Sequence, residues 1–251
     1  MQRYRYQDGF EGFLCAVSLC LVDGAEPTGF LRGTVETEPD LFGETVIEIA
    51  TDRQTALQFR ERFMKAVSQP AFATARYAFH SQRADVELLL WRYFTLGLKT
   101  GKRMGNMLAD RDVATVDKLG RGVAHEAHKY KGFIRFRELK QGFLYACIEP
   151  QADILVFLAP HFVQRIGDRP WMIHDMQRAQ AAIYDLKQWR LLQGVESSST
   201  PEYTQIEEEC TELWQHYFKR MAIKERYNPK LQQQHVPLRS RKYLVEFEPI
   251  K

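Results

Sequence analysis

The chain has 251 residues, of which 45% are hydrophobic and 12% aromatic, so it can bury a core as one large domain or two small ones and is not a disordered protein. Its formal net charge is only +3, which by itself indicates no class of partner. The N-terminus lacks the apolar core of a signal peptide and no apolar stretch is long enough to span a bilayer, so we expect a cytoplasmic protein that makes no membrane contact.

The first part of the chain is predicted to be mainly helical, because its apolar residues recur at helical spacing. A segment rich in Gly, Pro and acidic residues interrupts the helices and is typical of a loop. In chain order the pattern predicts a helix over FEGFLCAVSLCLV, a loop over 22–43 with a short extended piece at Gly29–Leu31, a strand over 45–51, and helices over 52–67, 71–79 and 85–98.

A helix over about 113–130 is expected to have two different faces. One face is an apolar stripe at helical spacing, formed by Val116, Leu119, Val123, Ala127 and Tyr130. The opposite face is cationic and carries Lys118, Arg121, His125, His128 and Lys129. We expect Gly132 to end this helix, since glycine is common just after a helix C-terminus.

The second part of the chain is predicted to be rich in strands. In chain order we expect a hairpin of FIRFREL and FLYACIE with a turn at 140–142, a segment 153–161 that is either helix or strand, a strand at Trp171–His174, two strands in RAQAAIYD and WRLL, a serine-rich linker at 194–201, an amphipathic helix over 206–221 and a basic arm from Arg226. The fold class is therefore α+β, with a helical N-terminal half, an antiparallel sheet with flanking helices in the C-terminal half, and a basic C-terminal arm. The expected domains are 1–110 and 111–251, or one fused domain.

Positive charge is concentrated in two segments. Residues 118–140 carry 7 basic and 2 acidic residues, and residues 219–251 carry 9 basic and 3 acidic residues. Guanidinium groups make two-point contacts to phosphate, and nearby aromatic rings can stack on an unpaired base. In the alternative interpretation these segments are a solvated charged face and a disordered tail. The predicted nucleic-acid contacts are Arg121, His125, His128, Lys129, Lys131, Arg135 and Arg137.

The hairpin adds a more specific expectation for its two arginines. Arg135 and Arg137 would project from the same strand face as Phe133. With a three-residue turn, Arg137 lies opposite Tyr145 and the two side chains could form a cation–π pair.

Signals for catalysis are weak. The chain has no phosphate-binding glycine motif and no nucleophile elbow, and its four cysteines form no CxxC pair that would suit zinc or an iron–sulfur cluster. HEAH at 125–128 has a spacing that can bind metal but lacks the zinc-protease pattern, so we expect no metal and no cofactor. Two histidines near aspartates are weak acid–base candidates, with ordinary hydrogen bonding as the alternative: His161, Asp168, His174 and Asp175.

Four blocks of the sequence resemble one family: DGFEGFLCAV, HEAHKYKGFIRFRE, HFVQRIGDRPWMIHD and RYNPKLQQQHVP. They are similar to bacterial proteins assigned to DNA repair or DNA metabolism and encoded beside a radical-SAM protein of DNA modification or repair. A related domain is similar to the N-terminal part of some uracil-DNA glycosylase fusion proteins. The tail departs from the family pattern, since Val236–Pro237 and SRKYLVEF stand where a Met-Pro and an aromatic-rich ending are typical.

The resemblance implies a DNA context and a radical-SAM partner, and it implies no catalytic residue. Our first hypothesis is a DNA-binding accessory that presents a damaged or distorted strand to that partner, which would own the iron–sulfur cluster. The second is a hydrolase or lyase acting on nucleic acid, similar to a glycosylase. The third is a protein–protein adaptor without nucleic-acid contact.

Overall fold

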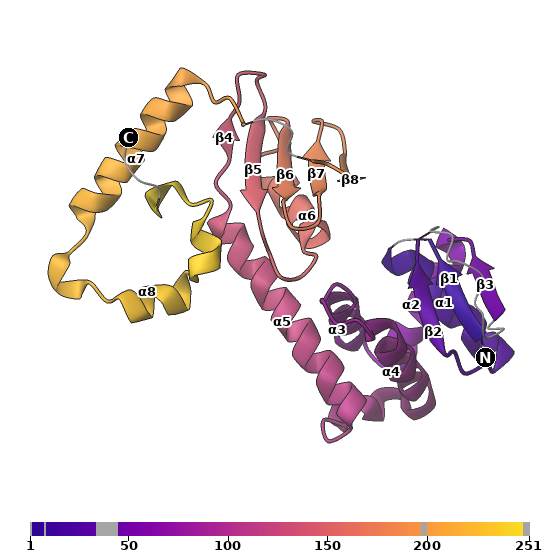
Figure 1. Ribbon diagram of the computed structural model, residues 1–251. Coiled ribbons are helices and arrows are strands. Elements are labelled where there is room, and N and C mark those ends of the chain that lie inside the picture. Colours follow the sequence, from indigo (N-terminus) through magenta and orange to yellow (C-terminus); the bar gives the residue numbers. More distant parts are fainter. Residues whose placement is uncertain (1, 8, 34–44, 197–199, 248–251) are drawn as a thin grey trace. The chain divides into compact units, whose positions relative to one another are not determined.

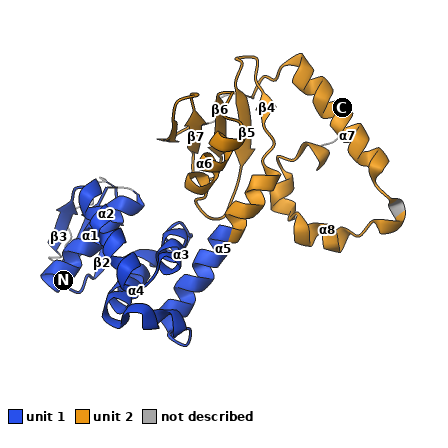
Figure 2. Ribbon diagram, turned by 180° about the vertical axis from the view of Figure 1, so that it is seen from behind, with its two compact units in different colours: residues 1–124 blue, residues 125–251 orange. Residues whose placement is uncertain are grey.

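A computed structural model describes residues 2–7, 9–33, 45–196 and 200–247 (Figure 1). The chain divides into two compact units, Met1–Ala124 and His125–Lys251, and each is described by itself (Figure 2). This division lies within helix α5 (Arg111–Phe133), later than the boundary expected at 110/111. Among the described residues, no helix combines the length and the apolar character needed to cross a bilayer.

The first unit contains a small sheet as well as helices. Its elements are β1 (Gln2–Tyr6), α1 (Phe10–Asp23), β2 (Gly29–Arg32), β3 (Thr45–Ile49), α2 (Arg53–Ala66), α3 (Gln69–Phe79), α4 (Val86–Thr100), η1 (Gly101–Asn106) and the first part of α5. The predicted helices and the predicted strand after residue 44 are therefore present. Residues 34–43 of the predicted loop lie outside the described residues.

The first unit is mainly helical, as expected, and its small sheet contains a first strand that the sequence pattern did not indicate. Its strand order is β2-β1-β3, and β1 runs parallel to both neighbours. In β1 the rings of Tyr4 and Tyr6 are buried on one face. The N-terminal segment Gln2–Tyr6 therefore forms the central strand, although it contains two arginines. Parallel strands need helical crossovers, and α1 supplies the one from β1 to β2.

The core of the first unit is built largely from phenylalanine rings. Phe63 packs edge-on against Phe94 with ring centroids 4.9 Å apart, and Phe13 stacks on Phe79 at 5.4 Å. These side chains come from α1, α2, α3 and α4, so one aromatic cluster joins four helices.

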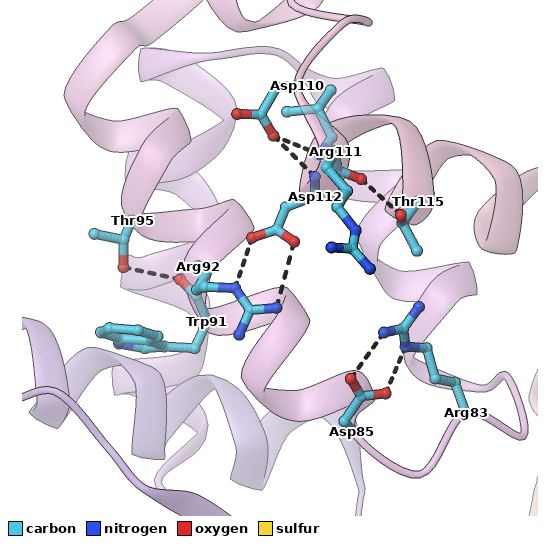
Figure 3. A network of polar contacts seen from close by, with 10 residues as sticks. Arg83, Asp85, Trp91, Arg92, Thr95, Asp110, Arg111, Asp112 and Thr115 are labelled. Atoms are coloured by element: carbon cyan, nitrogen blue, oxygen red, sulfur yellow. Dashed lines mark hydrogen bonds and ion pairs between the residues drawn. The ribbon is translucent and has the colours of Figure 1, made fainter.

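The start of α5 is fixed by polar contacts within the first unit (Figure 3). The carboxylate of Asp110 accepts hydrogen bonds from the backbone N–H groups of Asp112 and Val113, at 2.9 and 3.1 Å. Arg92 of α4 donates to the carboxylate of Asp112 at 2.6 Å. These contacts satisfy backbone donors that any helix N-terminus leaves free, and they tie α5 to α4.

The second unit is an α+β structure around a five-stranded sheet. Its elements are the end of α5, β4 (Arg137–Glu138), β5 (Leu144–Ile148), α6 (Leu155–Arg165), β6 (Trp171–Asp175), β7 (Gln180–Tyr184), β8 (Trp189–Gln193), α7 (Gln205–Met221), η2 (Lys224–Arg226), α8 (Pro229–His235), η3 (Leu238–Arg241) and η4 (Val245–Phe247). The α+β prediction is confirmed. Residues 197–199 of the predicted linker lie outside the described residues.

The sheet of the second unit is mixed rather than antiparallel. The strand order is β4-β5-β6-β7-β8, and β5 pairs with β6 in parallel while the other pairs are antiparallel. The helix α6 makes the crossover between the two parallel strands, which resolves the open assignment of 153–161 as helix. On the sheet, Phe162 of α6 lies 5.1 Å from the ring of Phe136 and packs near Trp171.

The predicted hairpin is shorter than expected, and the basic arm is folded. Of FIRFREL only Arg137 and Glu138 pair with the second strand of the hairpin, since α5 continues through Gly132 to Phe133, and Leu139 forms an isolated bridge with Tyr203. The segment after α7 forms α8 and three short 3-10 helices, and Leu244 and Val245 near its end are buried.

Candidate nucleic-acid interface

The end of α5 presents a cationic face outward. Val123, Ala127 and Tyr130 are buried, whereas His125 and His128 are exposed. Lys129 and Lys131 are half-buried along the two edges of this face, and long lysine side chains in that position cover apolar surface while keeping the charge in water. The predicted division of the helix into an apolar and a cationic face is therefore confirmed.

Most side chains of this face form no ion pair with the described residues. In the described part of the chain, His125, His128, Lys129 and Lys131 have no ion-pair partner. Arg121 differs, because it forms an ion pair with Asp117 one turn earlier; both residues belong to the first unit. The unpaired cations of the second unit can therefore attract a polyanion more strongly than Arg121 can.

The end of α6 adds one further cation, Arg165, and a histidine, His161, next to Lys131. His161 and Arg165 lie one turn apart on α6. Burial lowers the pKa of His161, and the positive charges of Lys131 and Arg165 lower it further. The Nε2 atom of His161 is buried and has no hydrogen-bond partner among the described residues. Positive charge from two helices therefore gathers around an unsatisfied ring nitrogen.

These residues together define what we call the α5–α6 cationic surface. Successive members on α5 are one to three residues apart, and Lys131 connects them to α6. The members of the α5–α6 cationic surface are His125, His128, Lys129, Lys131, His161 and Arg165. Sequence analysis missed Arg165, although its spacing from His161 would have revealed it once 153–161 was assigned to a helix.

Arg135 is held by the C-terminal segment instead of projecting freely. Its guanidinium donates to the carbonyl oxygen of Gly132 at 2.7 Å and to the carboxylate of Glu246 at 3.0 Å. The Glu246 side chain is only 9% exposed, so this ion pair is largely shielded from water. Shielding strengthens the pair and leaves less of the Arg135 charge for an external phosphate.

Arg137 belongs to β4, and its side chain extends toward α7. The expected register with Tyr145 is confirmed, but the cation–π partner is Tyr203, whose ring centroid lies 3.6 Å from the guanidinium carbon. The guanidinium is also 3.9 Å from the carboxylate of Glu207 on α7, and the Arg137 side chain is 18% exposed. Arg137 thus helps to fasten α7 to the sheet, a role that the sequence did not indicate.

The C-terminal arm uses part of its charge internally. Arg239 lies 3.6 Å from the carboxylate of Glu126 on α5, and Lys242 forms an ion pair with Glu149. Burial raises the pKa of Glu149, but hydrogen bonds from Lys242 and Tyr243 outweigh it, so the pKa of Glu149 is lowered below its ordinary value. These contacts hold the arm against α5 and the sheet.

The segment that contains these residues matches a known protein family. A family model described as a domain of unknown function, DUF4130, matches residues 84–246. The chain belongs to the DUF4130 family. No curated protein and no solved structure gives a significant match to the chain. The DUF4130 segment contains the whole α5–α6 cationic surface, and the sheet of the first unit lies outside it.

Within the DUF4130 segment, His174 is a satisfied core histidine. It is 3% exposed, its Nδ1 atom lies 2.9 Å from the hydroxyl of Tyr145, and its Nε2 atom lies 2.9 Å from the carbonyl oxygen of Val195. Because a carbonyl can only accept, Nε2 carries the proton and Nδ1 accepts from Tyr145. Both ring nitrogens are therefore used inside the protein.

The other predicted acid–base residues of the DUF4130 segment have separate surroundings. Asp175 is fully buried and pairs with Arg178 at 2.8 Å; burial raises the pKa of its carboxyl, and the charge and hydrogen bonds of Arg178 only partly oppose this. Asp168 is exposed in the loop after α6. The charged neighbours that lower the pKa of His161 are Lys131 and Arg165, and no carboxylate is among them. The aspartates are thus not assembled with His161 into an acid–base pair.

The HEAH histidines of the DUF4130 segment are two exposed side chains on α5. In the ranges that the structure describes, no three His, Cys, Asp or Glu side chains gather in a group that could hold a metal ion. The chemistry that this part of the molecule offers is therefore that of a cationic surface, in which imidazole and ammonium groups can contact phosphate.

Proposed function

We propose that the protein binds nucleic acid through the α5–α6 cationic surface and acts as an accessory in DNA repair or modification. The observation that carries the proposal is the group of unpaired cations on α5, continued on α6 by Arg165 and by His161 with its unsatisfied ring nitrogen. A phosphate bound at Lys131 and Arg165 would offset the two positive charges that lie beside the His161 ring. The sequence resemblance supplies the DNA context and the radical-SAM partner, which would hold the iron–sulfur cluster.

The proposal moves the main contacts from the hairpin to the helices. Arg135 and Arg137 were expected to contact the nucleic-acid strand, but partly buried carboxylates and a tyrosine ring of the protein contact them instead. We therefore assign phosphate contact to Lys129, Lys131 and Arg165, and a supporting structural role to the two arginines.

A fluorescence anisotropy titration with labelled single-stranded and duplex DNA tests this assignment. Replacing Lys129 and Lys131 together by glutamine is expected to raise the Kd about tenfold near 0.1 M salt, because two phosphate contacts are lost. Replacing Lys140 and Lys187, which lie outside the surface, makes the same change in charge and serves as the matched control, with less than about a twofold effect expected. Equal effects of the two double variants would contradict the assignment.

A base-release assay and a co-purification experiment, together with the same titration, separate the alternative functions. A catalytic protein similar to a glycosylase would release a base from a damaged duplex, which the proposed accessory alone does not do. An adaptor without nucleic-acid contact would co-purify with a radical-SAM partner and cause no change in DNA anisotropy at any salt concentration.

DNA affinity is expected to rise as the pH is lowered from about 8 to about 6. The pKa of His161 is lowered in the free protein, and a bound phosphate would favour the protonated ring, so binding takes up a proton there. By linkage, proton uptake on binding makes the affinity increase as the pH falls. Titrations at several pH values should show a smaller rise for His161→Gln than for the wild type. The same rise in both proteins would exclude His161 as a contact.

A further inference from the structure

Helix α7 has an apolar stripe that the described residues of the second unit do not cover. On one side the helix is anchored to the C-terminal segment, where Phe218 packs against Phe247 and the side chain of Gln215 donates to the carbonyl oxygen of Val245 at 2.8 Å. On another side large apolar residues face solvent, and Ile206 and Leu213 are 71% and 70% exposed. Figure 1 shows α7 along the edge of this unit.

The exposed residues form one continuous line. Their spacing of three, four and seven residues places them on one face of the helix over its whole length. The members of the α7 stripe are Ile206, Cys210, Leu213, Trp214, Tyr217 and Met221. Trp214 and Tyr217 stack with ring centroids 5.6 Å apart, so the middle of the stripe is a flat aromatic platform. A contiguous apolar face of this kind on a folded protein marks an interaction site.

The charges beside the stripe indicate what covers it. The first half of α7 is acidic and the last turn is basic, with Lys219 and Arg220. Glu209, whose carboxylate accepts a hydrogen bond from Gln205 at 3.0 Å, lies roughly three turns before Arg220 and therefore on the same flank of the stripe. A parallel second α7 would put acid against acid, whereas an antiparallel one would put acid against base.

We propose that α7 pairs with the α7 helix of a second copy of this chain, antiparallel about a two-fold axis. The axis passes between Leu213 and Trp214, so Leu213 of each copy packs on Trp214 of the other. The same rotation brings Glu209 of each copy beside Arg220 of the other, which gives two equivalent ion pairs at the edge of the apolar contact. Ile206 then faces Met221, and the stripe is covered from end to end.

The expected dimer is weak to moderate. A helix of 17 residues is about 25 Å long, so a contact between two such helices is small compared with a standard stable interface. We therefore expect a Kd in the micromolar range, roughly 1–50 μM.

Sedimentation equilibrium of the full chain tests the pairing. The wild type is expected to be dimeric at about 100 μM, and Leu213→Asp is expected to raise the dimer Kd about a hundredfold, because a charge replaces a central apolar contact. Leu213 is exposed in the single chain, so its replacement leaves the fold intact, which far-UV circular dichroism checks. A wild type that stays monomeric at about 100 μM, or a dimer that Leu213→Asp does not weaken, would overturn the proposal.

Charge reversal tests the antiparallel direction. Glu209→Lys and Arg220→Glu are each expected to raise the Kd about tenfold, since both put like charges together twice in the dimer. The double variant carries the reversed pair and is expected to return to within about twofold of the wild type. If the dimer Kd of the double variant rose by the product of the two single effects, this arrangement would be ruled out. Binding of a different protein to the α7 stripe in place of a second copy would also rule it out.

Discussion

Replacing Gly120 by alanine is expected to lower the free energy of unfolding of the first unit by about 2 kcal/mol, because overpacking of a close helix contact forces the backbones apart. Gly120 is buried where α5 crosses α3. A Cβ atom at this position would lie 2.5 Å from the carbonyl oxygen of Thr74 and 2.7 Å from its Cγ2 atom, and neither the backbone nor the branched side chain can move away easily. Urea unfolding of the full chain, followed by circular dichroism, measures the loss.

The matched control for this change lies two residues further along the same helix. Gly122 is exposed, and a Cβ atom there would meet no atom within 4 Å. Gly122→Ala is therefore expected to stabilise the helix by about 0.5–1 kcal/mol, since alanine is the better helix former. If both variants shifted the urea midpoint in the same direction, the close approach of α5 to α3 would be wrong.

Replacing Glu87 by alanine is expected to cost about 2 kcal/mol, because it leaves the buried hydroxyl of Tyr6 without its acceptor and removes the partly exposed ion pair with Arg32. The Glu87 carboxylate accepts from the hydroxyl of Tyr6 at 3.0 Å and from Nε of Arg32 at 2.5 Å, and its side chain is 11% exposed. Burial raises the pKa of Tyr6, so its hydroxyl remains a donor that needs this partner. Thermal or urea unfolding of the full chain would report the loss.

An exposed ion pair on the same sheet provides the comparison. Arg5 and Glu48 join β1 to β3 at 2.7 Å, but the Glu48 side chain is 66% exposed. Glu48→Ala is expected to cost less than about 1 kcal/mol, since water screens a surface ion pair. Similar losses from the two variants would show that Glu87 does not act as a buried acceptor.

The local pattern of apolar and polar residues was sufficient to predict most helices and strands of this fold. It failed where strand pairing depends on residues far apart in the sequence. The periodicity of 113–130 predicted both faces of α5 correctly. The first strand was missed because Arg3 and Arg5 alternate with Tyr4 and Tyr6, a pattern that also suits an unstructured polar terminus. Residue alternation also carries no information on strand direction, so the parallel pairing of β5 with β6 could be inferred only after α6 was recognised as a crossover.

The sequence predicted which basic residues belong to the candidate site, but it did not predict which of them pair with other side chains of the protein. The sequence indicated Lys129, Lys131, Arg135 and Arg137 equally well as cations. What separates them is contact with distant residues, since Glu246 reaches Arg135 from 111 residues away and the ring of Tyr203 packs on Arg137. Such long-range ion pairs leave no local signal, because any carboxylate in the chain is a possible partner until the fold is known.

The salt dependence of DNA binding tests the α5–α6 cationic surface most directly. In a plot of log Kd against log salt concentration, each phosphate contact contributes about 0.9 to the slope for duplex DNA. The variant with Lys131→Gln and Arg165→Gln is predicted to lose about 2 units of slope relative to the wild type, while the Lys140→Gln and Lys187→Gln control keeps it. A slope unchanged in the first variant, or lost equally in the control, would contradict the surface as the site of nucleic-acid binding.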